Sequence, residues 1–216
     1  MSKRGGPLLL GVLGVSCYTS SGTPVETPAA PAGPAAAAAV AALMTIDQAA
    51  VGPITAKTPG NLIGLRRALA GYEVKPAHLA IGPNANKLGF NVYKDGEKLL
   101  HVLPDPSGSI FSVHAVSSKV AAADRPWRAG AKLSGVRALS TCKCWEDEIV
   151  VCFRVGEHVA VSFARECNWD SYSTDDERQD LIGTPIHRVL WSPRPFGEGS
   201  NPYGGDEYGG EEYGGF

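Results

Sequence analysis

The segment "EIVVCFRVGEHVAVSFA" (residues 148–164) decides the fold, because it predicts an antiparallel hairpin. Val159, Val161 and Phe163 alternate with smaller or polar residues, which is typical of a strand with one buried face. Two apolar runs of strand-forming residues flank a tight turn at Gly156. The two runs, joined by this tight turn, therefore predict two antiparallel strands.

Outward from this hairpin, the chain contains further strand signals. "LGFNVYKDGEKLLHVLP" (residues 88–104) predicts a second hairpin, with Asp95-Gly96 as its turn. Other strands are predicted at 45–54, 72–74, 109–118 and 184–191. The strand at 109–118 follows the second hairpin closely, so these three strands form a predicted meander.

"TPGNLIGLRRALAG" (residues 58–71) predicts a short helix. Thr58 is the expected N-cap, Pro59 the first helical residue, and Gly71 the residue after the last turn. Apolar residues fall on one face, at Leu62, Leu65 and Leu69.

"RPWRAGAKLSGVRALS" (residues 125–140) predicts a second, weaker helix. Each half of the domain then reads as glycine turn, short helix and hairpin, which is compatible with a degenerate internal duplication. The predicted fold class is α+β, an antiparallel sheet or sheets with two short helices on one face.

The N-terminal sequence has the features of a bacterial export signal. Lys3 and Arg4 precede an apolar run at 8–15, and residues 1–16 are the predicted signal peptide. Cys17 directly after this run predicts a lipidated first residue, although Gly14 stands where such signals usually have leucine. The alternative is an ordinary cysteine without a lipid. Tyr18 rather than aspartate after the cysteine favours the outer membrane, with the protein facing the periplasm.

Regional composition divides the remainder of the chain. Residues 17–44 are rich in proline and alanine and predict a linker after the lipidated cysteine. Residues 45–195 form the predicted globular domain. Residues 196–216 repeat Tyr-Gly-Gly with acidic insertions and predict a disordered, solvated tail. The net charge of −2 does not favour nucleic acid as a partner.

Four cysteines between residues 142 and 167 have three interpretations: zinc ligands with His158 nearby, reactive thiols, or two disulfides. Structural zinc sites prefer two Cys-x(2–4)-Cys pairs, and this spacing is not present. An exported chain meets an oxidising compartment, so disulfides are favoured and no metal site is predicted. Four cysteines allow three connectivities, which spacing does not separate.

"VGPITAKTPGNLIGLRRALAGYEV", "VVCFRVGEHVAVSF" and "IHRVLW" resemble the YfeY-like family of sigma-E-regulated bacterial envelope lipoproteins. The resemblance covers residues 45–191 and implies a lipoprotein whose domain has no known function and no known catalytic residues. It also places two family cysteines at Cys144 and Cys152. We therefore expect one disulfide between these two and a second between Cys142 and Cys167.

The sequence contains no nucleophile elbow, zinc-protease motif or phosphate-binding loop, and no cofactor is predicted. Four of the five histidines lie in or beside predicted strands and are expected to face solvent or to lie at a sheet edge. "DDERQD" (175–180) is expected to be a solvated loop. We expect a non-enzymatic envelope module that binds a protein, peptidoglycan or lipopolysaccharide, with Trp127, Trp145 and Trp169 as contacts or as core residues. The alternative is a periplasmic enzyme whose polar residues meet only in the folded chain.

Overall fold

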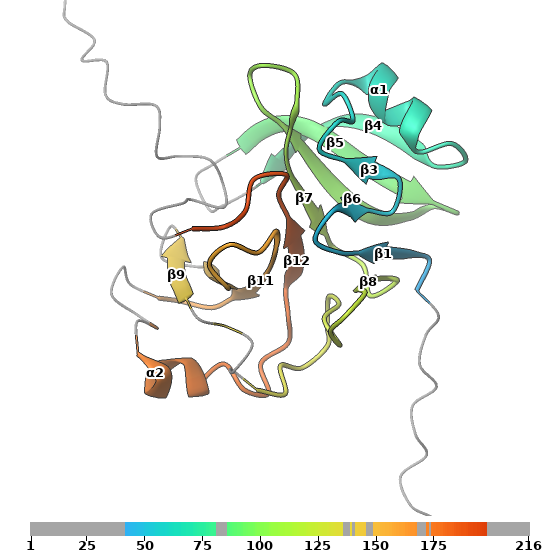
Figure 1. Ribbon diagram of the computed structural model, residues 1–216. Coiled ribbons are helices and arrows are strands. Elements are labelled where there is room, and N and C mark those ends of the chain that lie inside the picture. The colour runs from blue at the N-terminus through green and yellow to red at the C-terminus, as the bar shows by residue number, and fades with distance from the viewer. Residues whose placement is uncertain are drawn as a thin grey trace, which may run out of the picture. The chain divides into compact units, whose positions relative to one another are not determined.

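The computed structural model describes residues 42–80, 86–135, 139, 141–145, 149–167, 172 and 174–197. These residues form mainly antiparallel β-sheet, with two short helices (Figure 1). No helix among them is long and apolar enough to cross a bilayer. The predicted signal peptide, Cys17, most of the linker and residues 198–216 of the tail lie outside the described residues, so those assignments stay predictions.

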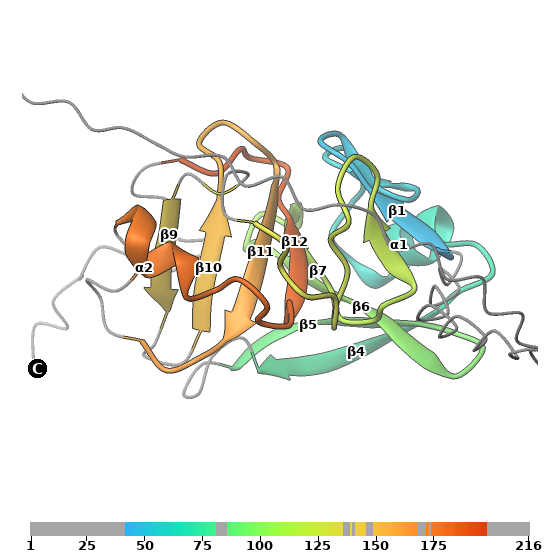
Figure 2. The ribbon, with the colours of Figure 1, turned by 90° about the horizontal axis from the view of Figure 1, so that it is seen from below.

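The large sheet has eight strands in the order β4-β5-β6-β7-β12-β11-β10-β9, and all neighbours are antiparallel. Its strands are Glu73–Ala80 (β4), Asn86–Lys94 (β5), Glu97–Pro104 (β6), Ile110–Ala115 (β7), Thr141–Trp145 (β9), Ile149–Phe153 (β10), Val159–Ala164 (β11) and Arg188–Trp191 (β12). Two meanders, β4 to β7 and β9 to β11, lie on either side of β12. The last strand therefore joins both halves of the chain in one sheet (Figure 2).

The β5–β6 hairpin confirms the predicted turn. Asp95 and Gly96 have φ angles of 50° and 79°, and Lys94 pairs with Glu97 across the turn. Positive φ at both central residues gives the turn the right twist for a two-residue hairpin, and the Asp-Gly sequence tolerates it. The strand predicted at 72–74 is longer than expected, since β4 continues to Ala80 along β5.

The small sheet has the order β3-β2-β1-β8, and its β1–β8 pair is parallel. Its strands are Met44–Ile46 (β1), Ala50–Val51 (β2), Ile54–Thr55 (β3) and Val120–Ala122 (β8). The single strand predicted at 45–54 is thus three short strands. The Asp47 carboxylate accepts hydrogen bonds from the Ala49 and Ala50 amides, which turns the chain after β1.

Helix α1 spans Leu62–Ala68, which is shorter than the predicted helix at 58–71. Asn61 caps it, because its side chain accepts a hydrogen bond from the Gly64 amide 2.9 Å away. The predicted cap was wrong: the Thr58 hydroxyl accepts from the Thr55 amide instead. The predicted apolar face is confirmed at Leu65 and Leu69, which are buried, and at Leu62, which packs against them.

The second predicted helix does not form in the described part of its range, residues 125–135. Gly130 has a φ of 80°, and its amide donates to the Ile186 carbonyl. Leu133 exchanges backbone hydrogen bonds with residues 183 and 184, so this segment pairs with a distant strand-like segment instead of with its own preceding turn. The match between halves that suggested an internal duplication is therefore not seen.

A different short helix, α2, spans Asp175–Gln179, within the segment that we expected to be a loop. Thr174 and Glu177 form a capping box, in which each side chain binds the other residue's backbone amide. Thr-x-x-Glu is a sequence signature of a helix start that the loop interpretation overlooked.

The large sheet carries apolar side chains on both faces. Val150 and Cys152 of β10 belong to a core that also contains residues of α1 and the small sheet, and we call this side the first face. The opposite side is called the second face. Its buried apolar residues are Leu79, Leu103, Ile149, Val151, Phe153, Ala160, Leu190 and Phe196.

The packed domain extends beyond the predicted bounds of 45–195 at both ends. Met44 is buried in the core of the first face. The Phe196 ring lies 5.4 Å from the Phe153 ring, centroid to centroid, on the second face. Phe196 therefore belongs to the domain and not to the predicted tail.

Candidate functional site

All four cysteines between residues 142 and 167 form disulfides, as predicted, but the predicted partners were wrong. The bonds are Cys142–Cys152 and Cys144–Cys167. The β9–β10 register places Cys142 directly opposite Cys152, with their Cα atoms 4.0 Å apart, whereas Cys144 lies opposite Val150. Cys144 therefore reaches Cys167, which follows β11 at a Cα separation of 5.7 Å.

The two disulfides indicate an oxidising compartment outside the cytosol, since such bonds are rare in reducing compartments. They join β9 to β10 and β9 to the segment after β11, at the edge of the large sheet. This makes the cysteines structural. Within the described residues, no group of three or more histidine, cysteine or acidic side chains is placed to hold a metal ion.

Of the three tryptophans considered as contacts, Trp127 is buried in the core of the first face. The Arg125 guanidinium lies 4.5 Å from the Trp127 ring centroid and covers the ring. Trp127 is therefore a core residue. The side chain of Trp145 and all of Trp169 lie outside the described residues.

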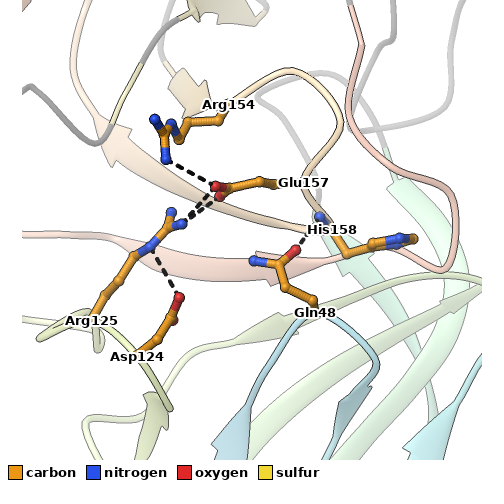
Figure 3. A network of polar contacts seen from close by, with 6 residues as sticks. All are labelled: Gln48, Asp124, Arg125, Arg154, Glu157 and His158. Atoms are coloured by element: carbon orange, nitrogen blue, oxygen red, sulfur yellow. Dashed lines mark hydrogen bonds and ion pairs between the residues drawn. The ribbon is translucent and has the colours of Figure 1, made fainter.

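A polar network joins the small sheet to the β10–β11 connection (Figure 3). Arg125, just after β8, forms an ion pair with Glu157 at 2.6 Å, and both side chains are mostly buried. Arg154 lies 3.4 Å from the same carboxylate. From the β1–β2 turn, the Gln48 side-chain oxygen accepts a hydrogen bond from the His158 amide at 2.7 Å. The network fixes one sheet against the other, and we interpret it as structural.

A row of directly paired residues crosses the second face over all eight strands of the large sheet. At its centre His101 of β6 lies opposite His114 of β7, and His114 lies opposite Leu190 of β12. From one edge of the sheet to the other, the row is Lys75, Asn91, His101, His114, Leu190, Ala160, Phe153 and Thr141. We call these residues the histidine row.

The neighbouring row on the same face adds further polar groups. Arg188 lies opposite Ser162, Ser162 lies opposite Val151, and Val151 lies opposite Lys143. The Ser162 side chain is fully buried. The side chains of Arg188 and Lys143 therefore project from the same face as the histidines.

Burial is the main cause that lowers the pKa of the imidazoles on this face. It lowers the pKa of His101 to about 4, with a further contribution from the Arg188 charge. Burial and Arg188 also hold the pKa of His114 well below its ordinary value. Both rings are therefore neutral at pH 7. His101 is only 8% exposed and His114 is 0% exposed. The expectation that these histidines lie at the surface or at sheet edges was wrong.

Among the described residues of this face, Ser112 and His114 form an arrangement that resembles catalytic chemistry. The Ser112 hydroxyl lies 3.0 Å from His114 Nε2, the distance at which a histidine accepts a serine proton. Both side chains are almost completely buried. The charged or titratable groups that lower the pKa of His114 are Arg188, His101 and His187, and none of them is a carboxylate.

Sequence reasoning missed this site because no motif joins its members. His101, His114 and Arg188 lie on three strands, and the β12 insertion brings them together. Alternation along β7 does carry a signal, since Ser112 and His114 occupy every second position of a strand whose other residues are apolar. That pattern places both on one face but does not identify their neighbours.

No known protein-family description matches the chain, and no curated protein is significantly similar to it. A solved structure does match: the crystal structure of the uncharacterized protein YfeY from Escherichia coli. The chain is similar to YfeY. The match covers 68% of this chain and 99% of YfeY, with 20% sequence identity and a TM-score of 0.49. It agrees with the resemblance found in the sequence, and it brings no activity because YfeY is uncharacterized.

Proposed function

We propose that the protein is a non-enzymatic module of the bacterial envelope, anchored through a lipid on Cys17 to the periplasmic side of the outer membrane. The cysteine pairing is the observation that carries this proposal. Two disulfides use the four cysteines of the domain, which leaves Cys17 as the fifth cysteine of the chain. That residue is the one that follows a basic segment and a short apolar run.

The compartment and the anchor support each other. Disulfides need export to an oxidising space, and the N-terminal sequence has the features of an export signal. Several acyl chains on one cysteine would hold the protein at a membrane, since each buried methylene contributes about 0.8 kcal/mol. The proline- and alanine-rich residues 17–44 would separate the domain from that membrane.

The module would bind an envelope protein, peptidoglycan or lipopolysaccharide. The exposed side of α1 supports a binding role, because Ile63 on that side is 75% exposed. Arg66 and Arg67 follow it at helical spacing and are exposed as well. An apolar side chain beside two guanidinium groups is suited to an anionic amphiphile, and among the three candidates this favours lipopolysaccharide.

Palmitate labelling in bacterial cells tests the anchor. The wild-type chain is expected to incorporate radiolabelled palmitate and to sediment with membranes, whereas Cys17→Ser is expected to do neither. Ser20→Ala, three residues away in the linker, is the matched control and should label like wild type. Label in the Cys17→Ser chain, or an unlabelled wild-type chain, contradicts the proposal.

A periplasmic enzyme is the second candidate, and the Ser112–His114 pair is the observation that favours it. A fluorophosphonate probe that reacts with activated serines would label Ser112 in that case, and Ser112→Ala would abolish the label. Burial of the pair and the cationic group beside it weigh against activation, since an orienting carboxylate normally supports such a histidine. We therefore expect no labelling.

A further inference from the structure

The two most exposed large apolar residues of the described chain lie on the same side of the large sheet. Ile63 of α1 is 75% exposed, and Leu88 of β5 is 70% exposed. Leu88 alternates along β5 with residues of the other face, as do Phe90 and Val92, which pack in the core of the first face. Its side chain therefore projects on the side that carries α1. Single exposed apolar residues are common, whereas several on one face indicate a surface for a partner.

The start of α1 lies at the same end of β5 as Leu88. Just before the helix, the Gly60 amide donates to the Gly108 carbonyl of the β6–β7 connection at 2.7 Å. That connection follows β6, whose last residues lie beside the start of β5. After the helix, the Gly71 carbonyl accepts a hydrogen bond at 2.9 Å from the ammonium of Lys94, the last residue of β5. The helix therefore runs along the first face from the Leu88 end of β5 to the Lys94 end.

Three cationic side chains lie at the far end of this helix. Arg66 and Arg67 are exposed in its last turn, where α1 packs against β4 (Figure 1). The Arg66 guanidinium lies 3.5 Å from the Val74 carbonyl of β4. The Lys94 ammonium lies 5.2 Å from the Tyr72 ring centroid. These contacts hold two of the three cations beside the end of α1.

No carboxylate of the described residues forms an ion pair with these three cations. The Glu73 carboxylate pairs instead with Lys75 at 2.9 Å, on the opposite side of β4. The Glu97 carboxylate pairs with Lys119. Asp95, next to the last residue of β5, offsets one of the three charges. The end of α1 therefore keeps an excess of positive charge that an anionic partner can neutralise.

Apolar and cationic groups are thus ordered along α1. Ile63 and Arg67 are four residues apart, which is about 6 Å along the helix axis. A lipid whose acyl chains are joined to phosphate groups has the same order of chemistry. Arginine binds phosphate through two parallel hydrogen bonds, and lysine binds it as a point charge. In lipopolysaccharide, lipid A is the part that carries both acyl chains and phosphates, whereas peptidoglycan has no acyl chains.

We propose that Ile63, Leu88, Arg66, Arg67 and Lys94, together called the α1 surface, bind the lipid A part of lipopolysaccharide. Acyl chains contact the two apolar side chains, and the phosphates lie beside the three cations. This inference rests on the proposed function, which favours lipopolysaccharide as the partner. It adds which part of that molecule is recognised and by which residues. The sugars beyond lipid A then remain in solvent.

Binding to separate parts of lipopolysaccharide tests this assignment. The chain used is residues 17–216 with Cys17→Ser and intact disulfides, so that no lipid anchor contributes. In surface plasmon resonance, lipopolysaccharide and isolated lipid A are expected to bind with similar affinity. Deacylated lipopolysaccharide that keeps its phosphates should bind at least about tenfold more weakly, because the apolar contacts are lost. Equal binding of the deacylated form, or equal binding to phosphatidylglycerol vesicles, would overturn the proposal.

Single substitutions test the residues. Arg67→Glu and Ile63→Ser are each expected to weaken lipid A binding about tenfold, through lost phosphate and acyl contacts respectively. Lys98→Glu, at an exposed position that faces away from α1, is the control for charge. Ile182→Ser, where the isoleucine is 45% exposed after α2, is the control for the apolar change. All four variants should keep the thermal midpoint of the parent chain, since the sites are exposed.

The outcomes separate this inference from the function on which it rests. If the chain binds no lipopolysaccharide at all, the partner favoured above is wrong and this inference falls with it. If lipopolysaccharide binds but Arg67→Glu and Ile63→Ser bind lipid A as tightly as the two controls, the partner stands and the α1 surface is wrong. Palmitate labelling of Cys17 is independent of both results.

Discussion

Protonation of His101 provides a quantitative test of the buried histidine row, with the pH lowered from 7 to 4.5 as the perturbation. Burial lowers the pKa of this ring to about 4 in the folded chain, whereas an unfolded chain has a histidine pKa of about 6.5. The unfolded state therefore binds more protons between these two values. Stability from this group is complete above pH 6.5 and is lost as the pH falls.

The expected loss follows from the two pKa values. Lowering the pH from 7 to 4.5 is expected to reduce the free energy of unfolding by about 2 kcal/mol through His101. The reason is that the unfolded chain binds this proton more tightly than the folded chain does. His114, whose pKa is lowered in the same direction, adds to this loss. The carboxylates of Glu97 and Asp105 have lowered pKa values because Lys119 and Ser107 donate hydrogen bonds to them. The stability that these two carboxylates contribute is lost mainly below pH 4.5, so the experiment stops at that pH.

Urea denaturation at the two pH values, followed by tryptophan fluorescence, is the assay. In His101→Gln the loss of unfolding free energy between pH 7 and 4.5 is expected to be smaller than in wild type by about 2 kcal/mol, because the variant lacks the titrating ring. His78→Gln, at an exposed position, should lose as much as wild type. The reasoning is refuted if His101→Gln loses as much as wild type.

Two further changes probe the parts of the structure that hold the sheets together. Replacing both Cys144 and Cys167 by serine opens a loop of 23 residues and is expected to lower the free energy of unfolding by about 3 kcal/mol in the chain-entropy model. Thermal and urea unfolding measure this, and an unchanged midpoint would contradict the pairing. Arg125→Ala leaves the mostly buried carboxylate of Glu157 without its closest partner and should cost about 1–3 kcal/mol. Arg154→Ala, at an exposed side chain, should change stability by less than about 0.5 kcal/mol; equal effects would refute the interpretation of this network.

The sequence by itself determined the features that depend on neighbouring residues. Asp95-Gly96 specified a hairpin turn because aspartate and glycine accept positive φ. The spacing of the α1 leucines determined which side of the helix is buried. The N-terminal export signal indicated that the cysteines of the domain form disulfides. The helix at 175–179 was also encoded locally, in a Thr-x-x-Glu capping box that sequence reasoning passed over.

The tertiary structure alone decided the features that depend on strand register and order. Cys142 pairs with Cys152 because the β9–β10 register sets them opposite each other, and a shift of one residue would turn these side chains to the other face. Insertion of β12 between β7 and β11 puts Arg188 on the same face as His101 and His114. Propensity and periodicity act over a few residues, whereas the pairing of distant strands is fixed by which apolar faces can be buried together. For this reason the sequence predicted most of the strands, and only the fold revealed the histidine row.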